Sequence, residues 1–191
     1  MDSVIAVRSL WLPILLSGVI VWVASAIIHM VLRYHRSDYS NLPGEATIMA
    51  AMRREALKPG MYLIPHCGSP KEMGKPEMIQ KYTEGPVAIM NVRPSGPPKM
   101  GKELGMWLAF CMVIGVFAAY VAGRTVGADA TYREVFRITG TVAFLGYAGT
   151  EPVNAIFKGQ PWPATIKHMF DGLVYAMLTA GVFGWLWPSS V

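Results

Sequence analysis

Charged residues and cysteine are both scarce in this chain. Only 15% of its 191 residues are Asp, Glu, Lys or Arg, whereas 53% are hydrophobic. That apolar content exceeds what the core of a soluble protein of this size needs, so it indicates a membrane protein. The two cysteines, Cys67 and Cys111, fall in a predicted loop and in the middle of an apolar run. We therefore expect no disulfide, and a reducing compartment suits the loop.

The sequence also lacks the short motifs of several well-known enzyme classes. It contains no HExxH, no paired CxxC, no GxSxG and no glycine-rich phosphate loop after a strand. His66 and Cys67 place a base beside a thiol, but neighbours along a strand point to opposite faces, which argues against a cysteine nucleophile. We therefore assign no catalytic residue from the sequence.

What the chain has instead is long apolar runs. A helix needs about 20 apolar residues to cross a bilayer core, and four runs meet that length, at about 10–32, 104–123, 135–157 and 169–187. The Ala-Ser-Ala at 24–26 resembles a signal-peptide cleavage site, but the preceding segment is nearly uncharged and the apolar run continues past it, so we expect this helix to be retained. The prediction is an all-α membrane protein built on a four-helix transmembrane bundle.

The apolar runs divide the chain into three parts. Residues 1–33 form the first helix, 34–103 an interfacial insertion, and 104–191 the three further helices. Within the insertion, an apolar stripe between a start with a proline and an acidic residue and a Pro-Gly stop predicts an amphipathic helix in 43–60. The β-like runs "MYLIPHC" and "PVAIMNV" predict a short β-hairpin.

Basic residues are distributed unevenly between the two sides of the predicted bundle. Of the 17 Lys and Arg, 13 fall in the loop 33–103 and the short turn 158–167. The positive-inside rule then predicts a cytoplasmic loop and periplasmic termini in a bacterial inner membrane. The net charge of +5 would face anionic lipid headgroups, so we expect bound lipids and need no nucleic acid as a partner.

Small residues recur every four positions in two of the predicted spans. They are Cys111, Gly115, Ala119 and Gly123 in the second span, and Gly172, Ala176, Ala180 and Gly184 in the fourth. This spacing lets helix backbones approach closely in lipid. It fits packing within one bundle, and it also fits a homo-oligomer or a docking face in a larger membrane complex.

Ionisable residues near the ends of the spans are the candidate functional residues. Such side chains are costly in hydrocarbon and usually face the interior of a bundle. The predicted buried polar network comprises His29, Arg33, Glu151, Asn154, His168 and Asp171. We expect Arg33 or a protonated histidine to pair with Glu151 or Asp171, because an unpaired buried charge is costly.

The same end of the bundle also collects residue types that bind transition metals. Imidazole, thiolate and carboxylate are the ligands of zinc, copper and iron. The candidate metal ligands are His29, His35, Asp38, His66, Cys67, His168 and Asp171. A metal site, a purely structural network and contacts with lipid headgroups all fit this pattern.

Four segments carry a resemblance that covers nearly the whole chain. They are "SLWLPILLSGVIVWVASAIIHMVLRYHRSDYSNLP", "PHCGSPKEM", "EGPVAIMNV" and "FDGLVYAMLTAGVFGWLWP". This pattern resembles a set of uncharacterised small bacterial inner-membrane proteins with four predicted helices. The resemblance implies the fold, the localisation and a bacterial origin, and it implies no activity or ligand.

Three functions are compatible with these observations. The first is a non-catalytic accessory or scaffold subunit of a bacterial membrane complex, which the small-residue stripes favour. The second is a metal- or proton-handling site on the cytoplasmic side. The third is a small oligomeric proton-coupled transporter that uses Glu151 or Asp171 as its coupling carboxylate.

Overall fold

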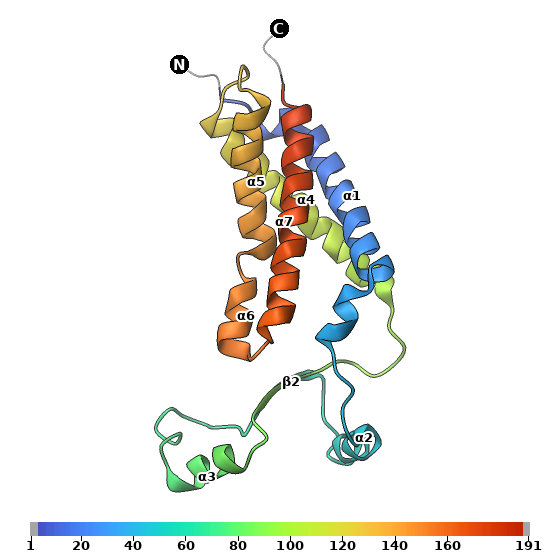
Figure 1. Ribbon diagram of the computed structural model, residues 1–191, viewed down its shortest axis with the longest axis vertical. Helices are drawn as coiled ribbons and strands as arrows, with labels where there is room; N and C mark the ends of the chain where they lie inside the picture. The colour runs from blue at the N-terminus through green and yellow to red at the C-terminus, as the bar shows by residue number, and fades with distance from the viewer. Residues whose placement is uncertain (1–3, 189–191) are drawn as a thin grey trace. The chain divides into compact units, whose positions relative to one another are not determined.

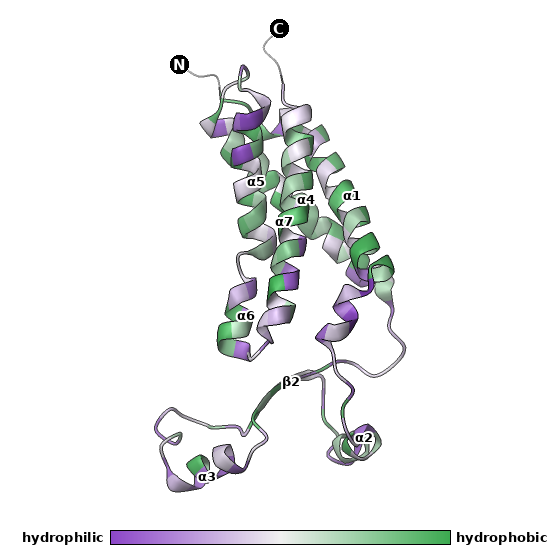
Figure 2. Ribbon diagram, viewed as in Figure 1, coloured by the Kyte–Doolittle hydropathy of each residue, from purple (hydrophilic) through white to green (hydrophobic). Residues whose placement is uncertain are grey.

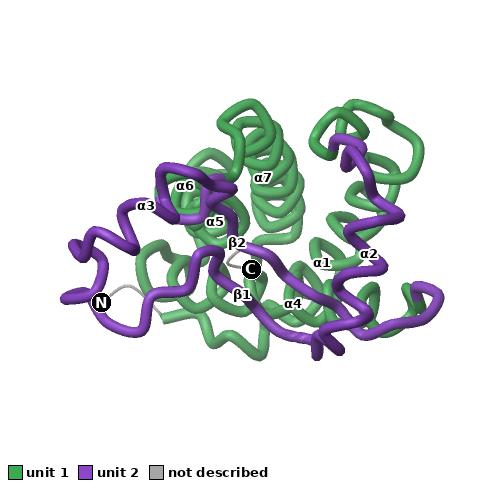
Figure 3. Tube along the Cα trace, turned by 90° about the horizontal axis from the view of Figure 1, so that it is seen from below, with its two compact units in different colours: residues 1–39, 99–156, 160–191 green, residues 40–98, 157–159 purple. Residues whose placement is uncertain are grey.

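The computed structural model describes residues 4–188, which are mostly helical and contain one two-stranded sheet. The chain forms two compact units (Figure 3). The first comprises residues 1–39, 99–156 and 160–191, and the second comprises 40–98 and 157–159. The predicted helical class with a small two-stranded element is therefore confirmed.

Four long helices make up most of the first unit (Figure 1). They are α1 (Trp11–Ala26), α4 (Met100–Thr125), α5 (Tyr132–Ala148) and α7 (Trp162–Trp185). A short 3-10 helix, η1 (Val7–Leu10), leads into α1, and a π-helical turn, η2 (Ile27–Val31), continues it.

Two segments of this unit, among the residues that the structure describes, are long and apolar enough to cross a membrane. They are Val7–Val31 and Met100–Thr125. Hydrophobic residues run along both in Figure 2. The other two predicted spans do not combine the necessary length with the necessary apolar character. Helix α5 has only 17 residues, and the first half of α7 carries Lys167 and Asp171.

The predicted third span, 135–157, is divided between two helices, so its prediction as one continuous helix was wrong. Helix α5 ends at Ala148, and α6 (Glu151–Lys158) begins after a break at Gly149 and Thr150. Pro152 explains the break, because it has no N–H to donate to the carbonyl four residues earlier and its ring crowds that turn.

The stripes of small residues pack helices of this chain against one another. A Cβ added at Gly115 would lie 3.3 Å from the Ile14 side chain, which places α4 directly against α1. A Cβ added at Gly172 would lie 2.7 Å from the Cβ of Ala148, which places α7 against α5. Of the eight stripe residues, the following are buried: Cys111, Gly115, Ala119, Gly123, Gly172, Ala176 and Ala180. Gly184 is half-buried and faces the Tyr132 ring.

The second unit contains helix α2 (Glu45–Arg54), strand β1 (Gly60–Ile64), helix α3 (Pro76–Glu84) and strand β2 (Ala88–Val92). The strands pair antiparallel, with Gly60 opposite Val92. The predicted β-hairpin was therefore wrong in its connection, because helix α3 lies between the two strands in the chain. None of the described residues 40–98 is fully buried, so this unit has no closed core of its own.

Candidate functional site

A change of helix type after α1 brings the first polar residues into position. In the π-helical turn η2, the N–H of Leu32 donates to the carbonyl of Ile27, and Leu32 is then extended. The chain continues as the 3-10 helix η3 (Arg33–Asp38), which packs against α7. The sequence placed η3 in the insertion, but it belongs to the first unit. π-Helical turns occur frequently at functional sites.

Asp171 on α7 is the most deeply buried charged residue of this region, with 2% of its surface exposed. The Tyr34 hydroxyl donates a hydrogen bond to its Oδ1. His35 Nε2 lies 2.7 Å from its Oδ2. Burial and the hydrogen bond to Asp171 raise the pKa of Tyr34 well above its usual value, so the phenol stays protonated and remains a donor.

Asp38 is a second buried carboxylate, and it is held from two sides. His35 Nδ1 lies 2.6 Å from its Oδ2, and Lys167 Nζ donates to its Oδ1 at 2.6 Å. Lys167 also donates to the Ser37 hydroxyl and to the Tyr34 carbonyl, at 2.7 and 2.9 Å. Burial alone would raise the pKa of Asp38, but the hydrogen bonds from Lys167 and His35 outweigh it and hold this pKa below its usual value.

The imidazole of His35 therefore bridges two buried carboxylates. Ionised carboxylates only accept hydrogen bonds, so both contacts need a donor on the ring. A cation at Nε2 can take the place of the proton there. A ligating histidine commonly donates its other N–H to a carboxylate, which fixes its tautomer and orientation. Asp38 stands in that relation to His35, which leaves Nε2 directed at Asp171.

Two further histidines lie around His35. The His29 ring centroid is 4.6 Å from that of His35, and the His168 ring stacks on His35 at 5.0 Å. Among the described residues, two groups have candidate ligand atoms within 4.8 Å of one another: His29, His35 and Asp171, and His35, Asp38 and His168. His29 from η2 and His168 from α7 thus each lie beside His35 of η3, in two groups of candidate ligands that share His35.

The structure brings five of the seven predicted metal ligands together, namely His29, His35, Asp38, His168 and Asp171. His66 and Cys67 belong to the second unit. There, the Cys67 thiol donates to the Ser69 carbonyl at 3.0 Å.

The predicted polar network is made by partly different residues. The histidine that pairs with Asp171 is His35, and the cation that reaches the cluster is Lys167, whereas Arg33 is exposed. Asn154 lies in α6. Sequence reasoning missed Tyr34 and Lys167. The spacing of Lys167 and Asp171, one turn apart on α7, was the available signal.

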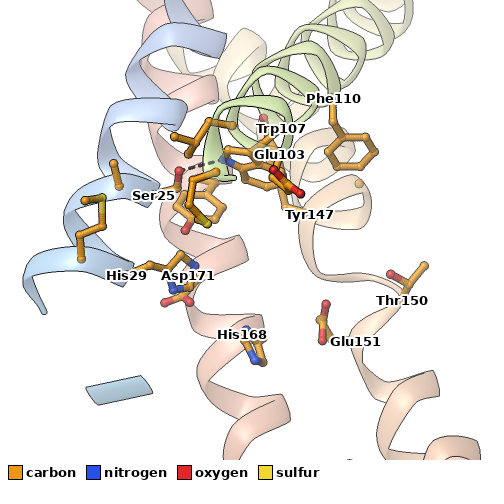
Figure 4. A pocket seen from close by; sticks show the side chains of 16 residues that line it. Ser25, His29, Glu103, Trp107, Phe110, Tyr147, Thr150, Glu151, His168 and Asp171 are labelled. Carbon is orange, nitrogen blue, oxygen red and sulfur yellow. Dashed lines mark hydrogen bonds between the residues drawn. The ribbon is translucent and has the colours of Figure 1, made fainter. Parts of the chain in front are cut away.

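A cavity of about 610 Å³ opens beside the histidines, between α1, α4, α5 and α7. His29, Glu151, His168 and Asp171 lie at one part of it, and Trp107, Phe110 and Tyr147 lie at another (Figure 4). The Trp107 indole donates to the Ser25 hydroxyl at 2.8 Å, which joins α4 to α1 at the cavity wall. The polar cluster therefore borders a mostly apolar space.

Comparisons of the chain with models of protein families, with curated proteins and with solved structures found no match. The arrangement of side chains is therefore the basis for a functional assignment.

Proposed function

We propose that this protein binds a transition-metal ion, Zn²⁺ or Fe²⁺, through His29, His35 and Asp171. The observation that carries the proposal is the convergence of these ligand atoms within 4.8 Å, with His35 already oriented at its other nitrogen by Asp38. Two imidazoles and a carboxylate are a common ligand set for both ions. Three protein ligands leave a coordination position for water or another small ligand.

Only small side-chain movements are needed to form this site. Metal–ligand bonds to imidazole nitrogen and carboxylate oxygen measure about 2.0 to 2.2 Å, so the ligand atoms of a tetrahedral site lie about 3.3 to 3.6 Å apart. His35 and Asp171 already lie closer than that, at 2.7 Å. His29 is exposed and would rotate toward them.

We also propose that the chain is a multi-pass membrane protein that crosses a bacterial inner membrane four times. Segment Val7–Val31 and helix α4 provide two spans, α5 with α6 the third, and α7 the fourth. The bias of Lys and Arg supports a cytoplasmic second unit and periplasmic termini. The absence of fully buried residues among 40–98 supports a unit that rests on the headgroup region. The resemblance to small bacterial inner-membrane proteins agrees with this placement.

The accessory-subunit hypothesis has less support than the metal site. Its main argument was the pair of small-residue stripes, and the structure uses both stripes for packing within the chain. The transporter hypothesis is weakened for Asp171, one of its two candidate carboxylates, because Tyr34 and His35 both hold Asp171 and a coupling carboxylate must be free to exchange protons. Co-purification of other subunits in stoichiometric amounts would favour the accessory role.

The experiment that tests the metal site is the metal content of the purified protein and of its His29→Gln variant. His29 is the informative position, because its loss leaves the hydrogen bonds of Tyr34, His35, Asp38 and Lys167 in place. We expect stoichiometric zinc or iron in the natural protein, by plasma mass spectrometry after exchange into metal-free buffer. His29→Gln should lose most of this metal while its circular dichroism and melting temperature stay close to the original.

His66→Gln is the matched control, because His66 is an exposed histidine of the second unit. Its metal content should equal that of the natural protein. If the natural protein contains no metal and takes up neither added Zn²⁺ nor added Fe²⁺, the cluster is a structural network and the proposal is wrong.

A further inference from the structure

The two-stranded sheet of the second unit has no helix packed extensively on either of its faces among the described residues. A sheet of two strands is marginally stable at best in water, and it ordinarily needs a third strand or a helix to cover its apolar side chains. Strands β1 and β2 therefore need a covering surface that the described part of the chain does not supply.

One face of this sheet is exposed and mostly apolar. Leu63 and Ile89 lie directly opposite each other, so they share a face, and Met61 belongs to the same face because it precedes Leu63 by two positions. Met61 is 68% exposed, Leu63 45% and Ile89 42%. The fourth member of this face is Asn91, which lies opposite Met61. We call these four residues the exposed sheet face.

The opposite face of the sheet is less accessible. Its members are all half-buried: Tyr62, Ile64, Ala88, Met90 and Val92. The need for a cover is therefore greatest on the exposed sheet face.

The connection between β2 and α4 indicates what covers that face. Residues 93–99 alone join β2 to α4, which is one of the two segments long and apolar enough to cross a membrane. Even fully extended, a linker of this length reaches less than about 30 Å, which keeps β2 within that distance of the start of α4. Arg93, Lys99 and Lys102 lie at this connection, and residues 93–102 contain no acidic residue. Basic residues beside a span are attracted to anionic lipid headgroups, so a bilayer surface matches both the apolar face and the charge of its connection.

We propose that the exposed sheet face inserts its apolar side chains into the headgroup region of the bilayer. The free backbone groups at the sheet edges can bond to water at that depth, whereas they could not do so in the hydrocarbon core. The proposal rests on the membrane placement proposed above, and it adds which surface of the second unit contacts lipid. It does not depend on the metal site, because β1 and β2 contain none of the grouped candidate ligands.

Fluorescence quenching by brominated lipid tests the proposal. Single cysteines are placed in the full chain with Cys67→Ser and Cys111→Ala, labelled with nitrobenzoxadiazole, and reconstituted into vesicles of equal parts acyl-brominated phosphatidylcholine and phosphatidylglycerol. Ile89→Cys should be quenched about twofold more strongly than Met90→Cys, because successive side chains of a strand point to opposite faces and only one of these faces contacts lipid.

The comparison is repeated on the other strand. Leu63→Cys should be quenched more strongly than Tyr62→Cys, by a similar factor. The two pairs are independent, so a variant that fails to fold on one strand leaves the test on the other strand intact.

Val113→Cys distinguishes failure of this proposal from failure of the membrane placement, because Val113 is 47% exposed and lies midway along α4. If Val113→Cys is strongly quenched while Ile89→Cys is quenched no more than Met90→Cys, α4 lies in the bilayer and the sheet proposal is wrong. If Val113→Cys is not quenched, the membrane placement of α4 is wrong and the sheet proposal fails with it.

Discussion

Lys167→Met should destabilise the protein strongly, because Lys167 joins η3 to α7. Its ammonium donates to three oxygens of η3, including that of Asp38, whose side chain is 5% exposed. Removing one partner of a buried ion pair costs about 3 to 5 kcal/mol. Lys167 is itself 27% exposed and Asp38 keeps its contact with His35, so we expect a smaller loss of about 2 to 3 kcal/mol.

The assay is thermal unfolding in detergent, followed by circular dichroism. For a chain of this length, 1 kcal/mol corresponds to about 2 to 4 °C in melting temperature, so Lys167→Met should melt about 4 to 12 °C lower. Lys75→Met is the matched control, because Lys75 forms an exposed ion pair with Glu72 at 3.6 Å. Exposed pairs contribute about 0 to 1 kcal/mol.

The double variant Lys167→Met with Asp38→Asn tests whether the loss of stability comes from leaving the Asp38 charge buried without its cation. It removes the buried negative charge together with its cation, so it should recover part of the lost melting temperature. If Lys167→Met melts within about 2 °C of Lys75→Met, the contacts between η3 and α7 do not stabilise the site and the reasoning fails.

Three further predictions follow from the membrane arrangement and the packing. A reporter fused to the C-terminus should read periplasmic, and Cys67 should resist an impermeant thiol reagent in intact cells; the opposite pattern would reverse the topology. Ala176→Leu with Ala180→Leu should lower the melting temperature of the monomer, because the added bulk separates α7 from α5, whereas an unchanged melting temperature would show that the contact is unimportant. Tyr175→Phe should melt at the same temperature or higher than the natural protein, since it removes a buried hydroxyl that has no hydrogen-bond partner among the described residues and costs about 1 to 3 kcal/mol; a lower value would indicate a hidden partner.

The small-residue stripes show what a local sequence pattern can predict about helix packing and what it cannot. The four-residue spacing predicts that a helix face packs closely, and the burial of Gly115 and Ala180 agrees with this. The spacing does not say which helix is the neighbour, because any smooth helix face can fill such a groove. The structure places α1 against the stripe of α4, and α5 against the stripe of α7.

The polar cluster shows a different limit. Sequence reasoning grouped all four histidines with Cys67, because all of them fall at or beyond one end of the predicted spans. Which of them meet depends on the course of the backbone after Ile27, where a π-helical turn and then η3 return the chain to α7. Because of that course, His35 and Tyr34 contact Asp171 and Lys167 donates to the Tyr34 carbonyl, whereas Arg33 is exposed.

Composition and periodicity by themselves determined that this chain is mostly helical and rich in segments that suit a membrane, because hydropathy and helix length are properties of continuous stretches of sequence. They also determined which residue types could bind a metal. Only the tertiary structure decided that the ligand atoms of His29, His35 and Asp171 lie within 4.8 Å of one another and that Tyr175 borders a cavity. His29 and His35 lie more than a hundred positions from Asp171 and Tyr175 along the chain, and the proximity of the two pairs depends on how four helices and one short turn pack, which no local pattern encodes.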